Sequence, residues 1–283
     1  MAVTGLLLID KESDWTSHDV VARLRGQLRE RRMGHAGTLD PMATGLLLVL
    51  CGRATRAAEY AEATEKQYLC ALRPGIVTDT QDISGNVLSE SALRPTEEEL
   101  KAVLPRFTGE IAQIPPMYSA IKIGGRKLYD IARKGGEVER EARKITVHSI
   151  EYCGESGGDY LLRIRCSKGT YIRTLCHDIG AALGCGAAMA SLRREKCGVF
   201  SVENASRIAE VTAEKLLPLD TLFSDKAALT LSAKQERLCR CGNDFRVDAE
   251  EGEYRFYGES GEFLAYGKVK AGQGRSIKSF FEV

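Results

Sequence analysis

The stretch GHAGTLDPMATGLLLV, residues 34–49, joins a glycine-rich loop to an apolar segment that has the composition of a buried strand. Gly34 and Gly37 permit backbone shapes and close approaches that other residues do not. Pro41 disfavours a helical conformation of Asp40, which is therefore expected to be extended. A carboxylate presented in this way suits nucleophilic or acid–base chemistry. The alternative is an ordinary Asp-Pro turn, which the loop taken alone favours.

The segments on either side of this loop predict a mixture of strands and helices. Residues 5–9 have the pattern of a short buried strand, and residues 17–27 that of a helix capped by Ser17. Thr96 opens a capping box in which Glu99 reaches back to the first amide. Further helices are expected at 53–63, from about residue 127, and at 171–183, and further strands at 43–50, 67–72, 145–152, 160–166 and 189–200. Because the two kinds of element mix without strict alternation, we predict an α/β (α+β) fold on a mixed, largely antiparallel sheet.

The last quarter of the chain has a different pattern. LLPLDTLF, residues 216–223, is typical of a linker or docking segment. Residues 228–283 contain short apolar runs separated by glycine turns, which indicates a small all-β module. We therefore expect a large domain over residues 1–222 and a small one over residues 228–283.

The composition is that of a globular protein with a substantial core, because 43% of the residues are hydrophobic and only 7 are proline. The first residues do not resemble a signal peptide, and no apolar run approaches the length of a membrane span. These features predict a cytoplasmic protein without a membrane partner. The nine cysteines are irregularly spaced, so we expect free thiols; Cys239 and Cys241 lack the second ligand pair of a zinc site.

Positive charge is concentrated in a few segments although the formal net charge is only +1. Residues 23–32 hold five arginines against one glutamate, and residues 122–144 hold eight basic residues against four acids. Residues 163–173 and 268–278 contain four basic residues each and no acid. Such clusters favour one positive face that binds a polyanion, with ordinary solvated surface as the alternative.

Six segments in this order closely resemble the TruB family of bacterial tRNA pseudouridine synthases. They are KESDWTSHDVV (11–21), GHAGTLDPMATGLLLV (34–49), EKQYLCAL (65–72), QIPPMYSAIKIGGRKLYDIAR (113–133), SKGTYIRTLCHDIG (167–180) and ASLRREKCGVF (190–200). The resemblance implies a pseudouridine synthase fold with a mobile RNA-clamping insert at about 105–145. It also implies a small PUA-like RNA-binding domain at the C-terminus, where the match is looser.

The reaction implied by this resemblance is the conversion of uridine 55 in the T-loop of tRNA to pseudouridine. Asp40 matches the catalytic aspartate of the family, which acts while the N-glycosidic bond breaks and uracil rejoins the sugar through carbon. Whether the carboxylate attacks the sugar, attacks the base or removes a sugar proton stays open. The resemblance implies no cofactor, no metal and no obligatory protein partner, with the T-arm of tRNA as the substrate.

The other residues carried over from the family line the same site. Tyr68 matches the tyrosine that stacks on the target base and accepts the proton from its C5, and Arg173 matches the arginine that pairs with the aspartate and keeps it ionised. The substrate-binding positions are His35, Tyr171, Leu192, Lys11 and Lys66, of which the two lysines are either RNA contacts or structural contacts. Without the resemblance, each of these residues also fits an ordinary structural role. Ala36 departs from the family, where many members have a hydroxyl residue beside the histidine.

Three other functions are compatible with parts of the sequence. A non-catalytic tRNA-binding or tRNA-folding protein could retain the fold, although Asp40, Tyr68 and Arg173 are all present. A guide-RNA-dependent pseudouridine synthase is disfavoured by the stretch at 113–133, which resembles the stand-alone bacterial type. A metal-dependent hydrolase is disfavoured because the four histidines have no ligand spacing.

Overall fold

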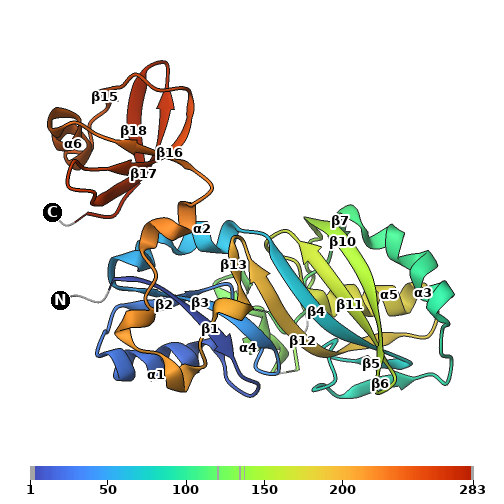
Figure 1. The fold of residues 1–283 in the computed structure, drawn as a ribbon. Helices are drawn as coiled ribbons and strands as arrows, with labels where there is room; N and C mark the ends of the chain where they lie inside the picture. The colour runs from blue at the N-terminus through green and yellow to red at the C-terminus, as the bar shows by residue number, and fades with distance from the viewer. Residues whose placement is uncertain (1–3, 120, 134, 137, 282–283) are drawn as a thin grey trace.

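The computed structural model describes residues 4–119, 121–133, 135–136 and 138–281. Its larger part is built on a sheet for which nine strands are described (Figure 1). Their order is β1 (Gly5–Lys11), β3 (Thr44–Cys51), β12 (Ala187–Cys197), β4 (Lys66–Pro74), β11 (Asp159–Cys166), β10 (Arg143–Ser156) and β7 (Gly109–Gln113), with β2 (Met33–Ala36) beside β3 and β13 (Phe200–Ser201) beside β12. The pairing of β12 with β3 is parallel, and the other neighbours in this sheet are antiparallel. The predicted mixed, largely antiparallel sheet is confirmed.

Strands β1 and β3 are buried on both faces, which explains their uninterrupted apolar sequences. Leu7 and Leu47 face one hydrophobic cluster, which includes residues of helix α1 (Ser17–Leu28). Leu6 and Leu46 face a second cluster, which includes residues of α2 (Ala58–Ala63) and the segment at 219–223. The sheet therefore forms the middle layer of this end of the molecule and fixes the loop between β2 and β3.

Caps were predicted for two helices, and one of them was assigned to the wrong residue. Helix α3 (Glu97–Val103) begins after Thr96 with Glu99 as its partner, as predicted. Helix α1 is capped by Thr16 rather than Ser17: Thr16 accepts a hydrogen bond from the Asp19 amide, and the Asp19 carboxylate accepts one from the Thr16 amide. Ser17 is free to bond elsewhere because its neighbour fills the capping role. Its hydroxyl bonds to the loop that holds Asp40.

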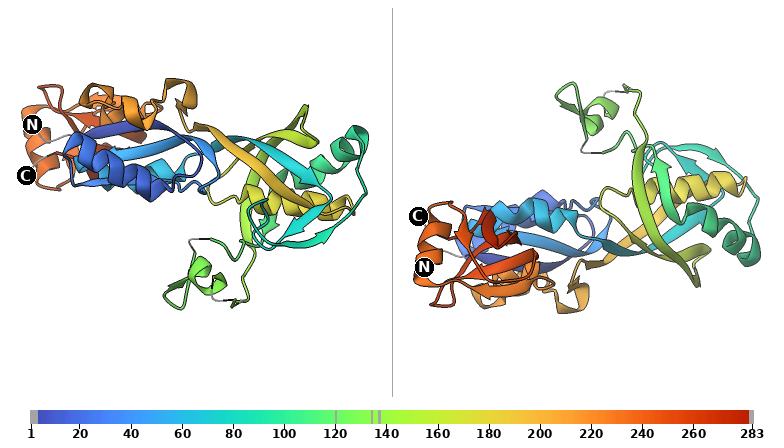
Figure 2. Two further views of the ribbon diagram at one scale, coloured as in Figure 1. Left: turned by 90° about the horizontal axis from the view of Figure 1, so that it is seen from below. Right: turned by 90° about the horizontal axis from the view of Figure 1, so that it is seen from above.

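The remaining predicted elements of the larger part lie where they were expected, but several differ in length. The helix expected at 53–63 is divided into a 3-10 turn, η1 (Gly52–Ala57), and α2. Helix α5 (Ile172–Ala182) lies where a helix was predicted, and α4 is short (Leu128–Ala132). Two small hairpins were not predicted, β5 (Ile76–Thr78) with β6 (Val87–Glu90), and β8 (Lys122–Ile123) with β9 (Arg126–Lys127). The segment that carries α4 projects away from the sheet in both views of Figure 2.

The C-terminal residues form a second sheet with its own core. Its order is β14 (Ala227–Thr230), β16 (Gly252–Tyr257), β17 (Phe263–Lys270), β18 (Gln273–Ser279) and β15 (Phe245–Arg246). An eight-residue helix, α6 (Ala233–Arg240), packs beside the strands and was not predicted. No helix in the described ranges is both long enough and apolar enough to cross a membrane.

An aromatic cluster joins this second sheet to the larger part of the molecule. Phe223 stacks on Tyr266 of β17, with ring centroids 4.7 Å apart, and meets Tyr60 of α2 edge-on at 5.5 Å. Tyr257 also donates a 2.6 Å hydrogen bond to Asp220. The segment expected to be a linker or docking element is therefore packed between the two sheets.

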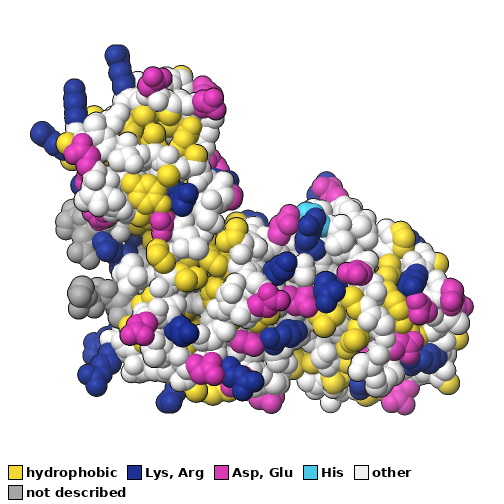
Figure 3. Space-filling view, viewed as in Figure 1, with side chains coloured by type: hydrophobic (Ala, Val, Ile, Leu, Met, Phe, Trp, Pro, Cys, Tyr) yellow, Lys and Arg dark blue, Asp and Glu magenta, His cyan; other side chains and the backbone are white. Residues whose placement is uncertain are grey.

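On the face drawn in Figure 3, basic and acidic side chains are interspersed, and several basic ones project from the C-terminal sheet.

Candidate active site

The loop between β2 and β3 holds Asp40 through hydrogen bonds on either side of it. The Ser17 hydroxyl donates to the Leu39 carbonyl at 3.2 Å and accepts from the Leu39 amide at 3.0 Å. The Asp14 amide donates to the Pro41 carbonyl at 2.9 Å. Gly37 has φ 71°, a conformation that glycine adopts without strain. The glycine-rich stretch expected to be entirely loop begins as strand β2, and the remaining turn is fixed in place.

Arg173, in the first turn of α5, binds the Asp40 carboxylate with two nitrogens. Its Nε lies 3.0 Å from Oδ2, and its Nη2 donates to Oδ1 at 3.2 Å. Arg173 is only 5% exposed, whereas 35% of the Asp40 side chain is exposed. The pair that the resemblance implied is present as a contact, with the carboxylate accessible and the guanidinium buried beneath it.

Further partners fix the other nitrogens of Arg173. Nη1 donates to the Thr80 carbonyl at 3.1 Å, and Nη2 also donates to the Tyr118 carbonyl at 2.8 Å. The buried Asp82 places Oδ2 3.6 Å from Nη1. Asp82 was not singled out from the sequence, because nothing marks an aspartate in the turn after β5 as a partner of a residue some ninety positions later.

The pKa of the Asp40 carboxyl lies above its ordinary value. Burial is the largest cause, and the negative charge of Asp82 adds to it. The positive charges of Arg173 and Lys11 act in the opposite direction. The sequence argument that Arg173 favours the ionised form is correct for that pair, but it omitted the larger effect of burial.

Tyr68 is a buried residue of the main hydrophobic core. It stands on β4, directly opposite Arg194 of β12, and only 8% of it is exposed. Burial raises the pKa of its phenol to about 12. Leu192, also on β12, shares one hydrophobic cluster with Tyr68 and with Leu39, the residue before Asp40. Tyr68 and Leu192 thus belong to the same core as the Asp40 loop.

Arg194 is a second residue, besides Asp82, that the sequence analysis missed. It is 1% exposed, and its Nε donates to the Leu46 carbonyl at 2.6 Å. Its Nη2 donates to the Gly37 carbonyl at 2.8 Å. The sequence offers two adjacent arginines, and only the register of β12 shows that Arg194 turns inward while Arg193 pairs with Asp10.

His35 lies on the strand that leads into the Asp40 loop, and Tyr171 lies two residues before Arg173. His35 is half-buried on β2, where its ring meets that of His18 edge-on at 5.7 Å, and burial lowers its pKa. Tyr171 precedes α5 and is held by Gln113, whose side chain bonds both its amide (2.8 Å) and its carbonyl (3.0 Å). Burial raises the pKa of the Tyr171 phenol, and the charges of Arg173 and Asp40 both act on it. The phenol therefore lies within electrostatic reach of the ion pair.

Lys11 and Lys66 are buried and bond to backbone carbonyls. The Lys11 ammonium donates to the carbonyls of Glu12, Trp15 and Pro41 at 3.0, 2.7 and 3.0 Å. Burial lowers its pKa to about 8. Lys66 donates to the carbonyls of Glu62 and Thr64 and also has a lowered pKa because of burial. Of the two roles left open for these lysines, this geometry favours the structural one.

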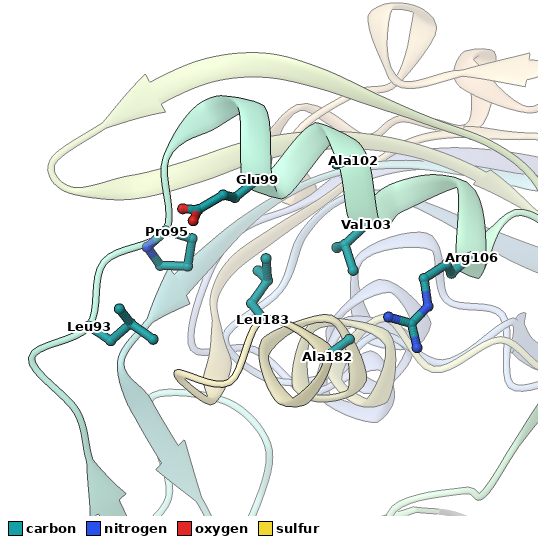
Figure 4. Close-up of a pocket in the computed structure, with 8 residues that line it drawn as sticks. All are labelled: Leu93, Pro95, Glu99, Ala102, Val103, Arg106, Ala182 and Leu183. Atoms are coloured by element: carbon teal, nitrogen blue, oxygen red, sulfur yellow. The ribbon is translucent and has the colours of Figure 1, made fainter.

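A pocket of about 370 Å³ lies between α3 and the end of α5 (Figure 4). Its walls include Leu93, Val103, Arg106 and Leu183. Arg173 stands at the opposite end of α5, so about 15 Å of helix separates the pocket from the ion pair. The pocket is therefore not part of this site. Within the described ranges, no three His, Cys, Asp or Glu side chains are grouped as a metal ion would require.

Comparisons with protein families match most of the chain. The model described as "TruB family pseudouridylate synthase (N terminal domain)" matches residues 25–172. The model described as "tRNA pseudouridylate synthase B C-terminal domain" matches residues 173–229.

Similar proteins bear the name tRNA pseudouridine synthase B. The one from Opitutus terrae is 50% identical over 216 residues, covering 76% of this chain and 88% of that protein. The one from Azoarcus sp. is 41% identical over 278 residues (95% and 92%), and the one from Clostridium perfringens is 43% identical over 280 residues (94% and 95%).

Two solved structures share the fold across 99% of this chain and 86% of their own. "Crystal Structure of a Cbf5-Nop10-Gar1 Complex" is 25% identical, with a TM-score of 0.76. "Structure of H/ACA RNP bound to a substrate RNA containing 2'-deoxyuridine" is 23% identical, with a TM-score of 0.74.

Proposed function

The chain belongs to the TruB family of tRNA pseudouridine synthases, and we propose that it isomerises uridine 55 in the T-loop of tRNA with Asp40 as the catalytic carboxylate. Membership of this family supports the reaction class, which is the formation of pseudouridine in tRNA. The observation that supports the site is the accessible Asp40 carboxylate, clamped by Arg173 in the loop with the most specific family motif. A protein that only bound or folded tRNA would have no use for this pair.

The reaction needs a group that stabilises the sugar or base while the two are separated. The bond between C1′ and N1 breaks, a bond between C1′ and C5 forms, and one proton moves from C5 to N1. The product is an isomer of the substrate, so no electron acceptor and no second substrate enter the balance. Asp40 is placed to act in the first step because Arg173 fixes both of its oxygens.

The apolar wall and the flanking rings supply the surroundings of the base. Tyr68 and Leu192 would contact the two sides of the extruded uracil, and Tyr68 would take the C5 proton. Tyr171 lies within the field of the ion pair and would line the space that receives the base. His35, on the strand that leads into the loop, would lie in the T-loop near the extruded nucleotides.

The parts of the chain outside the site suggest how the RNA is held. We assign residues 1–222 to the catalytic domain, with an RNA-clamping insert at about 105–145, and residues 228–283 to a PUA-like domain. The part of the insert that carries α4 projects from the sheet (Figure 2), and Tyr118, also in the insert, accepts a hydrogen bond from Arg173 through its carbonyl. RNA that presses on the insert would therefore act on the residue that holds Asp40. No protein partner is needed in this arrangement.

The proposal is tested by mapping pseudouridine in an unmodified tRNA transcript incubated with the purified protein alone. Carbodiimide labelling and primer extension should show one new stop, at the T-loop uridine. A transcript with cytidine at that position should show none. A stop elsewhere would refute the assignment to uridine 55, and activity only after a guide RNA is added would move the chain to another class of synthase.

A further inference from the structure

Arg194 is the most deeply buried arginine of the described chain, and it has no carboxylate partner there. It is 1% exposed, and no Asp or Glu oxygen of the described residues lies within 4.0 Å of its guanidinium. A buried cation without a partner costs several kcal/mol unless its donors are satisfied. Two donors bond the carbonyls of Leu46 and Gly37 at 2.6 and 2.8 Å. Its charge remains without an anion.

The third partner of Arg194 is the phenol of Tyr68. The two residues face each other across β12 and β4 as a direct antiparallel pair, and the positive charge of Arg194 acts on the Tyr68 phenol. Directly opposed residues on neighbouring strands have their Cβ atoms about 5 Å apart, so the sheet itself holds this contact. Arg194 therefore presents its charge to a group that becomes an anion when it loses a proton.

The same guanidinium packs under the Asp40 loop. A Cβ atom added at Gly37 would lie 3.2 Å from Nη1 of Arg194, and Gly37 accepts one of its hydrogen bonds. Gly37 is three residues before Asp40. One side chain thus connects the loop that bears the carboxylate to the strand that bears the tyrosine.

We propose that Arg194 positions Tyr68 and neutralises its phenolate when Tyr68 takes the C5 proton of uracil. This inference rests on the proposed function, in which Tyr68 is the base. The C–H electron pair returns to the ring and restores the C5–C6 double bond, and the proton passes to the phenolate oxygen. The isomerisation moves one proton from C5 to N1, so the reaction balances if the proton that Tyr68 gives up ends on N1 and the proton from C5 regenerates the phenol.

Electrostatics support this role. Burial makes the phenolate unfavourable and is the main reason that the pKa of Tyr68 is raised to about 12. The positive charge of the facing Arg194 acts to lower that pKa. Without Arg194 the phenol would be still harder to deprotonate, and removal of the C5 proton would slow more than the other steps.

The neighbouring Arg193 provides a matched control. It lies on the same strand, and its two terminal nitrogens bond Asp10 at 3.0 and 2.9 Å. Its side chain is 40% exposed, and no contact joins it to Tyr68 or to the Asp40 loop. Arg193→Gln removes the same charge at the adjacent residue without touching the proposed contact.

The experiment measures single-turnover rates on tRNA transcripts that carry uridine or 5-deuterouridine. Arg194→Gln should slow the rate by about 100-fold with unchanged tRNA affinity, the size expected for impaired base catalysis. Its deuterium isotope effect should exceed that of the wild type, because cleavage of the C5–H bond becomes limiting. Arg194→Lys should restore part of the rate, and Arg193→Gln should match the wild type in both readouts.

An unchanged isotope effect in a slow, folded Arg194→Gln protein would overturn the proposal, since Arg194 would then only support the loop. If Arg194→Gln does not fold, Arg194→Lys decides by comparison in a Tyr68→Phe background. In that background, Arg194→Lys should cause no further loss of the single-turnover rate. A loss of rate that adds to that of Tyr68→Phe would overturn the proposal. Failure of the wild type to form pseudouridine would instead count against the proposed function itself.

Discussion

Arg173 holds both oxygens of Asp40, with Nε 3.0 Å from Oδ2 and Nη2 3.2 Å from Oδ1, although the two residues are 133 positions apart. The carbonyls of Thr80 and Tyr118 occupy other donor positions of the same guanidinium. The orientation of the carboxylate is therefore determined by a side chain that is itself fixed from three directions. A planar fork of this kind cannot be replaced by a single charge.

Arg173→Lys should slow pseudouridine formation by at least about 100-fold while leaving tRNA affinity within a few-fold of the wild type. Lysine keeps the charge but cannot bond two carboxylate oxygens and two carbonyls in one plane. Single-turnover rates and filter binding on the same transcript check this. A lysine variant with nearly full activity would mean that charge alone matters and that the bidentate contact does not.

Asp82→Asn should shift the acidic limb of the rate profile to lower pH. Asp82 raises the pKa of Asp40, so removing its charge lowers that pKa and keeps Asp40 ionised further into acid. The rate requires ionised Asp40 and falls as the pH drops through its pKa, so the sign of the shift is fixed. Single-turnover rates measured from acidic to neutral pH locate the limb in each variant.

Asp79→Asn is the control for this shift, because Asp79 lies in the same hairpin and bonds Asn86 instead of Arg173. Its profile should coincide with that of the wild type. A limb that moves to higher pH in Asp82→Asn would contradict the assignment of that limb to Asp40.

Phe223→Ala should loosen the C-terminal sheet from the rest of the molecule. Phe223 is 3% exposed and contacts Tyr60, Tyr266 and Phe280, so its removal leaves a cavity at the joint. The expected loss is about 3–5 kcal/mol of unfolding free energy. Calorimetry should show the C-terminal sheet unfolding at a lower temperature than the larger part, whereas one unchanged transition would show that the joint contributes little.

The affinity for tRNA should fall as salt rises, because binding a polyanion releases counterions. Neutralising Arg23 and Arg31, two exposed residues of the first basic segment, should reduce the slope of log affinity against log salt by about 1 per lost phosphate contact. Arg94→Gln is the control, since Arg94 is engaged with Glu155 at 2.8 Å. A slope near zero in the wild type would contradict a positive RNA-binding face.

The parts of the fold that local sequence determines were predicted correctly. The apolar runs of β1 and β3 indicate buried strands, and Thr96 with Glu99 indicates the start of α3, because these patterns reflect contacts within a few residues. Strand β2 was missed because its pairing with β3 is a tertiary contact and its sequence, MGHA, has no strand pattern. The cap of α1 was predicted at Ser17, but Thr16 caps this helix and the Ser17 hydroxyl bonds Leu39 of the Asp40 loop, which is a tertiary contact.

The site was predicted through family resemblance more than through physical pattern. Asp40, Tyr68 and Arg173 lie in motifs and could be named, but the contact between Asp40 and Arg173 depends on how α5 and the loop pack. Asp82 and Arg194 escaped notice because one is an ordinary turn aspartate and the other is one of two adjacent arginines. Burial, which no short motif encodes, sets the direction of the Asp40 pKa.

The central claim is that Asp40 performs the chemistry on the T-loop uridine, and tritium release from tRNA made with 5-tritiated uridine tests it most directly. The wild type and Asp14→Asn, a change at an exposed aspartate of the neighbouring loop, should both release tritium. Asp40→Asn should release none while binding tRNA with similar affinity. Release by a folded Asp40→Asn protein at a rate near that of the wild type would contradict the claim.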